Sequence, residues 1–135
     1  MNPTLTALAG FVAWSLLLLV VMEAVRARLV LSGAVAANAF TPDNSNLSPF
    51  MQRLARAHAN CVEGLPVFGG LMVVAVLAGK SSVTDPLAYA FLCARIVQSI
   101  IHLSSLSAPA VTLRFSAFAV QMGIGAYWAF RLLVG

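Results

Sequence analysis

Residues 5–25 form an apolar run whose only charged residue is Glu23. At 1.5 Å per residue, a helix of this length spans the roughly 30 Å hydrocarbon core of a bilayer. The rest of the chain could not cover such a helix in water, because 61% of the 135 residues are hydrophobic and only 9% are charged. A typical soluble domain carries about 25% charged residues. The sequence therefore predicts an all-α integral membrane protein.

Three more apolar blocks follow, and together they predict a single domain over residues 1–135. The predicted transmembrane helices form a four-helix bundle and cover approximately residues 4–31, 51–79, 86–105 and 109–134. Segment 32–50 is the one long polar stretch, which is typical of a water-exposed loop. We expect Pro86 in the first turn of the third helix, where its missing N–H costs no hydrogen bond. No internal repeat is present.

The first apolar run is predicted to be a retained helix rather than a signal peptide. Residues 34–37 faintly resemble a cleavage site, but no Lys or Arg precedes the run, which is also too long. Arg26 and Arg28 lie between the run and that site, which is unusual for a signal peptide.

Arginines predict the orientation in the membrane. Those beside the first loop are Arg26, Arg28, Arg53 and Arg56. The opposite side has Lys80, offset by Asp85, and Arg131. By the positive-inside rule, the loop is cytoplasmic and both termini lie outside, in a bacterial inner membrane or its equivalent. The net charge of +4 is thus explained without a nucleic-acid partner, since no dense basic run is present.

Polar residues recur at helical spacing inside three of the predicted spans. Each ionisable group at the centre of a span costs about 2.5–3.5 kcal/mol, so such groups are candidates for function. The stripes are Arg56, Asn60 and Glu63 on the second helix, Arg95, Gln98, Ser99 and His102 on the third, and Arg114 and Gln121 on the fourth. In a bundle we expect these three faces to meet.

Depth along the helices suggests how the polar groups pair. Counted from the cytoplasmic ends, Glu63 is roughly 14 Å deep and Arg95 about 15 Å deep at 1.5 Å per residue. Because a buried charge needs a partner, we expect a structural ion pair between Glu63 and Arg95. This pair could serve stability alone.

Cationic residues at shallower depth predict a ligand site above that pair. Arg56, His102 and Arg114 lie about 3–9 Å into the bilayer, and Arg28 ends the first helix at a similar level. They would bind an anionic, water-soluble ligand, and the apolar groove beside them would hold a lipophilic ligand from the bilayer. A simpler alternative for the three arginines is that they extend to lipid headgroups.

The second helix carries a specific motif. It resembles the signature of the MAPEG family, the membrane-associated proteins of eicosanoid and glutathione metabolism, whose pattern is close to R-A-x-x-N-x-x-E-x-x-P-x-F. Its fixed positions are met by Arg56, Ala57, Asn60, Glu63, Pro66 and Phe68. Length, four spans and Arg95 in the third helix fit as well, so the resemblance covers essentially the whole chain.

The resemblance implies a homotrimer that binds glutathione as co-substrate between neighbouring subunits. The expected reaction is conjugation of glutathione to lipophilic electrophiles, reduction of lipid hydroperoxides, or both. We expect glutathione to contact Arg28, Arg56, Asn60, Glu63, Gln98, His102 and Arg114. Relatives activate the thiol with an arginine early in the fourth helix, for which Arg114 is the candidate. The third-helix motif of relatives is near R-x-x-H-x-x-x-Y, and its histidine and tyrosine, possible hydrogen-bond donors to the thiol, are replaced here by Gln98 and His102. His102 could act as the donor instead, so it is the second catalytic candidate.

Other functional classes stay open on the sequence alone. A non-catalytic membrane scaffold of the same family would carry the same motif. A small transporter could use Glu63 as a proton-coupled site. A haem or quinone protein could use His58 and His102 as ligands. No metal site is expected, because Cys61 and Cys93 lie singly inside apolar blocks.

Overall fold

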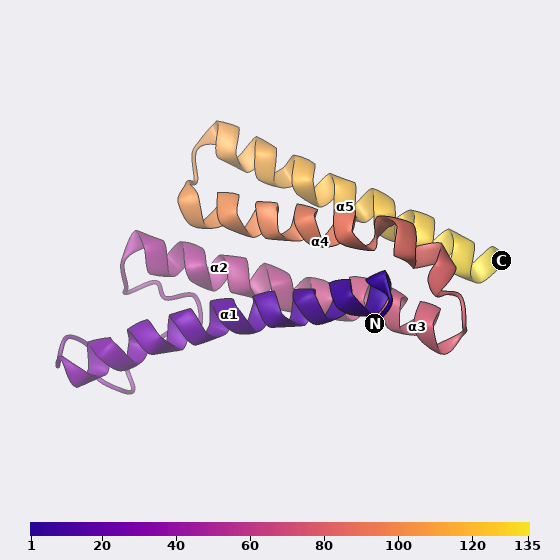
Figure 1. The fold of residues 1–135 in the computed structure, drawn as a ribbon. Coiled ribbons are helices and arrows are strands. Elements are labelled where there is room, and N and C mark those ends of the chain that lie inside the picture. The colour runs from indigo at the N-terminus through magenta and orange to yellow at the C-terminus, as the bar shows by residue number, and fades with distance from the viewer.

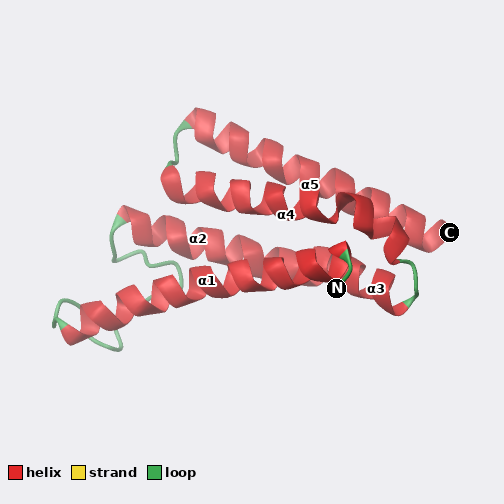
Figure 2. Ribbon diagram, in the orientation of Figure 1, coloured by secondary structure: helices red, strands yellow, loops and turns green.

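The computed structural model describes all residues, 1–135, and every regular element in it is helical (Figure 2). The elements are α1 (Pro3–Leu31), α2 (Pro49–Gly64), the π-helical turn η1 (Leu65–Gly69), α3 (Gly70–Leu77), α4 (Ser81–Ser104) and α5 (Ala108–Val134). Because α2, η1 and α3 are continuous, four helical spans are long and apolar enough to cross a membrane. The predicted multi-pass architecture is confirmed.

Three of the four spans begin with the same local chemistry. Asn2, Ser48 and Ser107 each accept a hydrogen bond from a backbone N–H in the first turn of α1, α2 and α5. A proline follows within two residues in each case, where its fixed φ favours the helix and no N–H is needed. Polar caps at these points fix where each apolar span starts.

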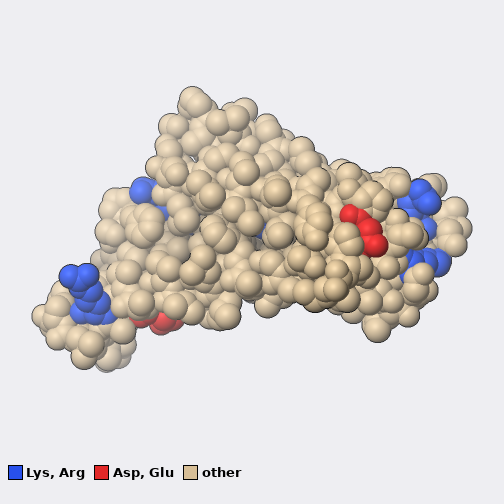
Figure 3. All heavy atoms as spheres, viewed as in Figure 1, with Lys and Arg blue, Asp and Glu red and all other residues tan.

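The two helical hairpins, α1 with α2–η1–α3 and α4 with α5, pack into one bundle (Figure 1). The long loop and the α4–α5 turn lie at one end, and both chain termini lie at the other. Charged side chains gather near these two ends, and the surface between them is almost free of charge on the face drawn in Figure 3. This distribution fits a bilayer around the middle of the bundle.

The third span begins earlier than the sequence predicted. α4 starts at Ser81, so Pro86 lies inside the helix rather than in its first turn. Asp85, which suggested a turn in the sequence, instead contacts the start of α1. The Thr4 backbone N–H donates to the Asp85 carboxylate at 3.1 Å, and the Thr4 hydroxyl donates to it as well. Asp85 thus satisfies a free N–H of α1 from a neighbouring helix.

The long loop is held against the bundle by one buried side chain. Asn44 has a φ of 56°, and its amide donates to the Met51 carbonyl at 2.7 Å. Its side-chain oxygen accepts from Arg26 Nε at 3.1 Å. Asn tolerates the left-handed region better than most residues. The loop is therefore fixed both to α1 and to the start of α2.

Four aromatic rings pack against one another inside the bundle. The ring of Phe91 on α4 lies 4.9 Å from Phe68 on η1, 5.6 Å from Phe11 on α1 and 5.6 Å from Trp128 on α5, centroid to centroid. All four residues are buried. This cluster fills the space between α1, η1, α4 and α5 in the middle of the bundle.

Candidate functional site

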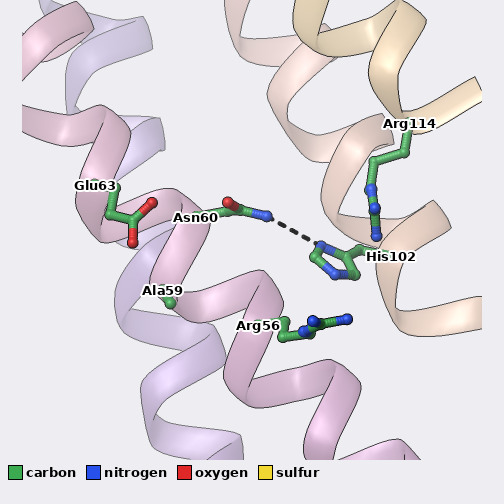
Figure 4. Close-up of a pocket in the computed structure, with 6 residues that line it drawn as sticks. All are labelled: Arg56, Ala59, Asn60, Glu63, His102 and Arg114. Atoms are coloured by element: carbon green, nitrogen blue, oxygen red, sulfur yellow. Dashed lines mark hydrogen bonds between the residues drawn. The ribbon is translucent and has the colours of Figure 1, made fainter. Parts of the chain in front are cut away.

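A polar cavity of about 320 Å³ opens near the loop end of the bundle. It is lined by Arg56, Ala59, Asn60 and Glu63 from α2, His102 from α4 and Arg114 from α5 (Figure 4). Sites for small molecules start at about this size. Five residues expected to contact glutathione thus lie around one cavity, although they come from three helices.

The cavity separates positive from negative charge. Figure 4 shows the Arg56 and Arg114 guanidinium groups directed toward His102 on one side, while the Glu63 carboxylate lies on the other. Arg114 Nη1 is buried and has no hydrogen-bond partner. Such an arrangement is complementary to a ligand that carries both carboxylates and an ammonium group.

His102 is oriented by Asn60. The Asn60 amide nitrogen donates to His102 Nδ1 at 3.2 Å, so the ring proton of the neutral imidazole is on Nε2. His102 is 3% exposed, and its Nε2 is buried without a partner. A buried N–H group without a partner is unusual, so this donor beside the cavity is a candidate for a hydrogen bond to a ligand atom.

Two of the expected contacts lie outside this cavity. Gln98 lines an adjacent cavity of about 250 Å³, together with Asn60, Val111, Arg114, Phe115 and Phe118. Because Asn60 and Arg114 line both, the two cavities are neighbours. Arg28 is exposed in the last turn of α1 and lines neither. The structure therefore does not bring Arg28 to the site.

The expected ion pair between Glu63 and Arg95 is absent. The one ion pair in the chain joins Arg26 and Glu23 at 3.0 Å. Glu63 is exposed, whereas Arg95 is 1% exposed and reaches the other side of α2, where its Nη1 donates to the Asn60 carbonyl at 3.4 Å. Glu63 and Arg95 lie at the same depth, as expected. However, Arg95 approaches Gly64, and the side chain of Glu63, one residue earlier on the helix, points about 100° away.

Aromatic rings surround the Arg95 guanidinium in place of a carboxylate. Its central carbon lies 5.2 Å from the ring centroid of Phe11 and 5.9 Å from those of Phe68 and Phe118. Ring faces attract cations, and more strongly where water is excluded. Nε and Nη2 of Arg95 have no hydrogen-bond partner. The motif comparison did not anticipate this surrounding, because the rings come from three separate helices.

The geometry also bears on the haem alternative. His58 lines a different cavity, between α1, α2 and the loop, and takes no part in the one that contains His102. The two imidazoles therefore do not face a shared space in which they could bind one iron from both sides.

The sequence was also compared with known proteins. A sequence profile of the MAPEG family matches residues 4–134. The chain belongs to the MAPEG family. No curated protein and no solved structure matches it. As a MAPEG protein with four membrane-spanning helices, it is a multi-pass integral membrane protein of a family associated with glutathione.

Sequence reasoning missed two residues that pack beside the candidate site. Gly64 was not singled out, although the Arg95 guanidinium occupies the space that a side chain at this position would fill. Gln121 was placed on a polar stripe but given no role, and the structure shows it bonded to Gln98. The sequence contained a sign of each: Gly64 directly follows the motif residue Glu63, and Gln121 is a second amide in the span after that of Gln98.

Proposed function

We propose that this protein is a membrane enzyme that binds glutathione in the polar cavity and transfers its thiolate to lipophilic molecules, or uses it to reduce lipid hydroperoxides. The observation that carries the proposal is the meeting of two arginines, one glutamate and a free imidazole N–H around one cavity. Membership of the glutathione-associated MAPEG family supports the same ligand.

The charges of glutathione match the charges of the cavity. Arg56 and Arg114 suit its two carboxylates or its thiolate, and Glu63 suits its ammonium group. Glu63 is free for this role because it has no ion-pair partner within the subunit. Asn60 would contact the peptide backbone of the ligand while its amide nitrogen orients His102.

Chemistry at the site needs the thiolate. A cysteine thiol has a pKa of about 8.5 and is mostly protonated at neutral pH. A guanidinium in a medium of low dielectric favours the thiolate, which is the nucleophile. Arg114 is the proposed source of this effect, because its Nη1 is buried and unpartnered at the cavity. His102 Nε2–H would add a hydrogen bond in the place where relatives use tyrosine.

We further propose that the functional unit is a homotrimer with its first loop in the cytoplasm. Arg56 and Glu63 are exposed on the surface of a helix that spans the bilayer. Polar groups facing lipid are costly, so a neighbouring subunit would cover them. The same neighbour could supply Arg28, which does not reach the cavity of its own chain. Light scattering of the detergent-solubilised protein, corrected for detergent, tests the assembly.

Titration of the purified protein with glutathione tests the central proposal. Calorimetry should give saturable binding, and the thiolate should appear as increased ultraviolet absorbance at neutral pH. S-methylglutathione, which binds but has no thiol, is the matched ligand control and should give binding without absorbance. Absence of binding would remove the enzyme proposal. Binding without thiolate would instead favour the non-catalytic scaffold.

A transporter is the weaker candidate. Arg95 does not neutralise Glu63, which leaves Glu63 available as a proton-coupled site. However, the polar cavity lies at one end of the bundle, and the aromatic cluster of Phe11, Phe68, Phe91 and Trp128 fills the middle. Uptake into vesicles that depends on Glu63 would be needed to restore it.

A further inference from the structure

Two buried amides, Gln98 on α4 and Gln121 on α5, meet beside the polar cavity. Gln121 Nε2 donates to Gln98 Oε1 at 2.9 Å, and Gln98 and Gln121 are 6% and 0% exposed. Burying two amides within a bilayer costs free energy that an apolar pair would not. The pair therefore needs an explanation beyond packing.

A chain of hydrogen bonds fixes the orientation of both amides. Gln121 Nε2 also donates to the Ala117 backbone carbonyl, at 3.1 Å. A carbonyl can only accept, so the Gln121 atom that faces it must be the nitrogen. The Gln98 atom that faces this nitrogen must then be the oxygen. As a result, the two N–H groups of Gln98 are directed away from Gln121.

These N–H groups are free and accessible. Gln98 Nε2 donates to no protein atom, and it is not among the sealed polar atoms that lack a partner. Gln98 lines the 250 Å³ cavity, whose apolar walls are Val111, Phe115 and Phe118, and Phe115 is 63% exposed. Arg114 lines this cavity and the polar one. A lipophilic molecule entering between the rings would meet hydrogen-bond donors at the inner end.

We propose that Gln98 is a hydrogen-bond donor to the carbonyl oxygen of the second substrate, a lipophilic α,β-unsaturated carbonyl compound, and that Gln121 is the residue that positions it. This inference rests on the proposed glutathione chemistry and assigns Gln98 to the second substrate rather than to glutathione. Donors aimed at the atom on which charge develops are among the strongest contributions to catalysis.

The reaction balances without an oxidant or a reductant. Glutathione releases its thiol proton to water when it binds as the thiolate. The sulfur then forms a bond to the β-carbon, and the electron pair of the C=C bond shifts to place negative charge on the carbonyl oxygen. Gln98 Nε2–H stabilises that charge. The α-carbon finally takes a proton from water, and the C=O bond is restored.

The test compares an electrophile that develops charge on oxygen with one that does not. We would measure kcat/KM for trans-2-nonenal and for benzyl chloride, in which charge leaves on chloride, with the intact protein in detergent and lipid. Gln98→Met keeps the side-chain length but removes the donor, and it should lower the ratio of enal to halide rates by about 100-fold. Gln121→Leu keeps the donor but frees its orientation, and it should lower the ratio by roughly tenfold.

Cys93→Ser, on the exposed face of α4, is the control and should leave the ratio unchanged. Equal losses with both electrophiles, together with a raised KM for glutathione, would assign Gln98 to glutathione and overturn the inference while the proposed function stands. An unchanged ratio in the Gln98 and Gln121 variants would also overturn it. Wild-type protein that uses neither electrophile and binds no glutathione would remove the proposed function itself.

Discussion

Arg95 lies directly against Gly64, so that a Cβ on this glycine would be 2.7 Å from Arg95 Nη2. The guanidinium has little room to move, because Phe11, Phe68 and Phe118 surround it. The absence of a side chain at residue 64 therefore allows an uncompensated cation to pack inside the bundle.

Replacing Gly64 by alanine should destabilise the protein. The added methyl overlaps the guanidinium, and relief would require Arg95 to leave the Asn60 carbonyl, so we expect a loss of about 1–3 kcal/mol in the free energy of unfolding. Gly70→Ala is the matched control, since nothing lies within 4 Å of a Cβ there. In a helix that change should stabilise by roughly 0.4–1 kcal/mol. Denaturation followed by circular dichroism in detergent compares the two, and equal stabilities would contradict the close contact.

Glu63→Gln should separate ligand binding from stability. Breaking a buried ion pair costs about 3–5 kcal/mol, but Glu63 has no such partner in its subunit. We therefore expect little change in Tm and at least a tenfold weaker affinity for glutathione, about 1.4 kcal/mol, from loss of the contact to its ammonium group. Thermal scans and calorimetry measure the two effects. A large fall in Tm with normal binding would mean that Glu63 is structural.

Arg114→Ala should abolish the thiolate absorbance of bound glutathione. Removal of the guanidinium leaves the thiol in a low-dielectric cavity without a cation, so the protonated form is favoured. Arg114→Lys should restore part of the absorbance, since charge remains but the geometry of the guanidinium is lost. Arg131→Ala is the control: this arginine is exposed at the far end of α5, where its Nη1 donates to the Tyr127 hydroxyl. Normal thiolate in Arg114→Ala would remove Arg114 from its catalytic role.

Asn44→Ala should loosen the long loop. Both the bond to the Met51 carbonyl and the acceptor for Arg26 are lost, and alanine is less favourable at a φ of 56°. We expect a loss of about 1–3 kcal/mol in the free energy of unfolding and faster amide exchange over residues 32–48. Asn46→Ala, which removes one exposed bond, should cost less than about 1 kcal/mol. Unchanged exchange in the Asn44 variant would show that other contacts hold the loop.

Asp43 provides a pH test in the same loop, outside the membrane. The Thr41 hydroxyl donates to its carboxylate at 2.8 Å, and this bond, with the Ser45 backbone N–H, lowers the pKa of Asp43 below its ordinary value. The stabilisation is present above the ordinary pKa and is lost as the pH falls through the lowered one. Thr41→Val should raise the pKa of Asp43, measured by NMR titration. No change on substitution would exclude the hydroxyl as the main cause.

The sequence predicts the fold of this protein better than it predicts the contacts within the site. Hydropathy predicted the four spans, because a segment that must cross a bilayer has few alternatives. The start of α4 was misplaced, since Asp85 and Pro86 suggested a turn, and only the packing of α1 shows that Asp85 bonds to Thr4. The residues of the polar cavity followed from spacing and from the family motif.

The partner of Arg95 could not be predicted in the same way. Spacing along one helix gives a face and a depth, but it does not give the rotation of that face relative to the next helix. Glu63 and Arg95 agree in depth and differ in direction, so the pairing failed. The Gln98–Gln121 pair was missed for the opposite reason: both residues were on predicted polar stripes, but neutral amides gave no electrostatic cause to join them.

The unpaired charge of Arg95 also contributes to how the site responds to ionic strength. Dissolved salt weakens attraction between exposed charges beyond roughly 8 Å under physiological conditions, but it acts much less on charges that ions cannot approach. Arg95 is enclosed by three aromatic rings and adjoins the backbone of Asn60, one of the cavity residues. Its field reaches an anion in the cavity through protein rather than through electrolyte. The attraction should therefore persist in concentrated salt that releases anions from an open basic surface.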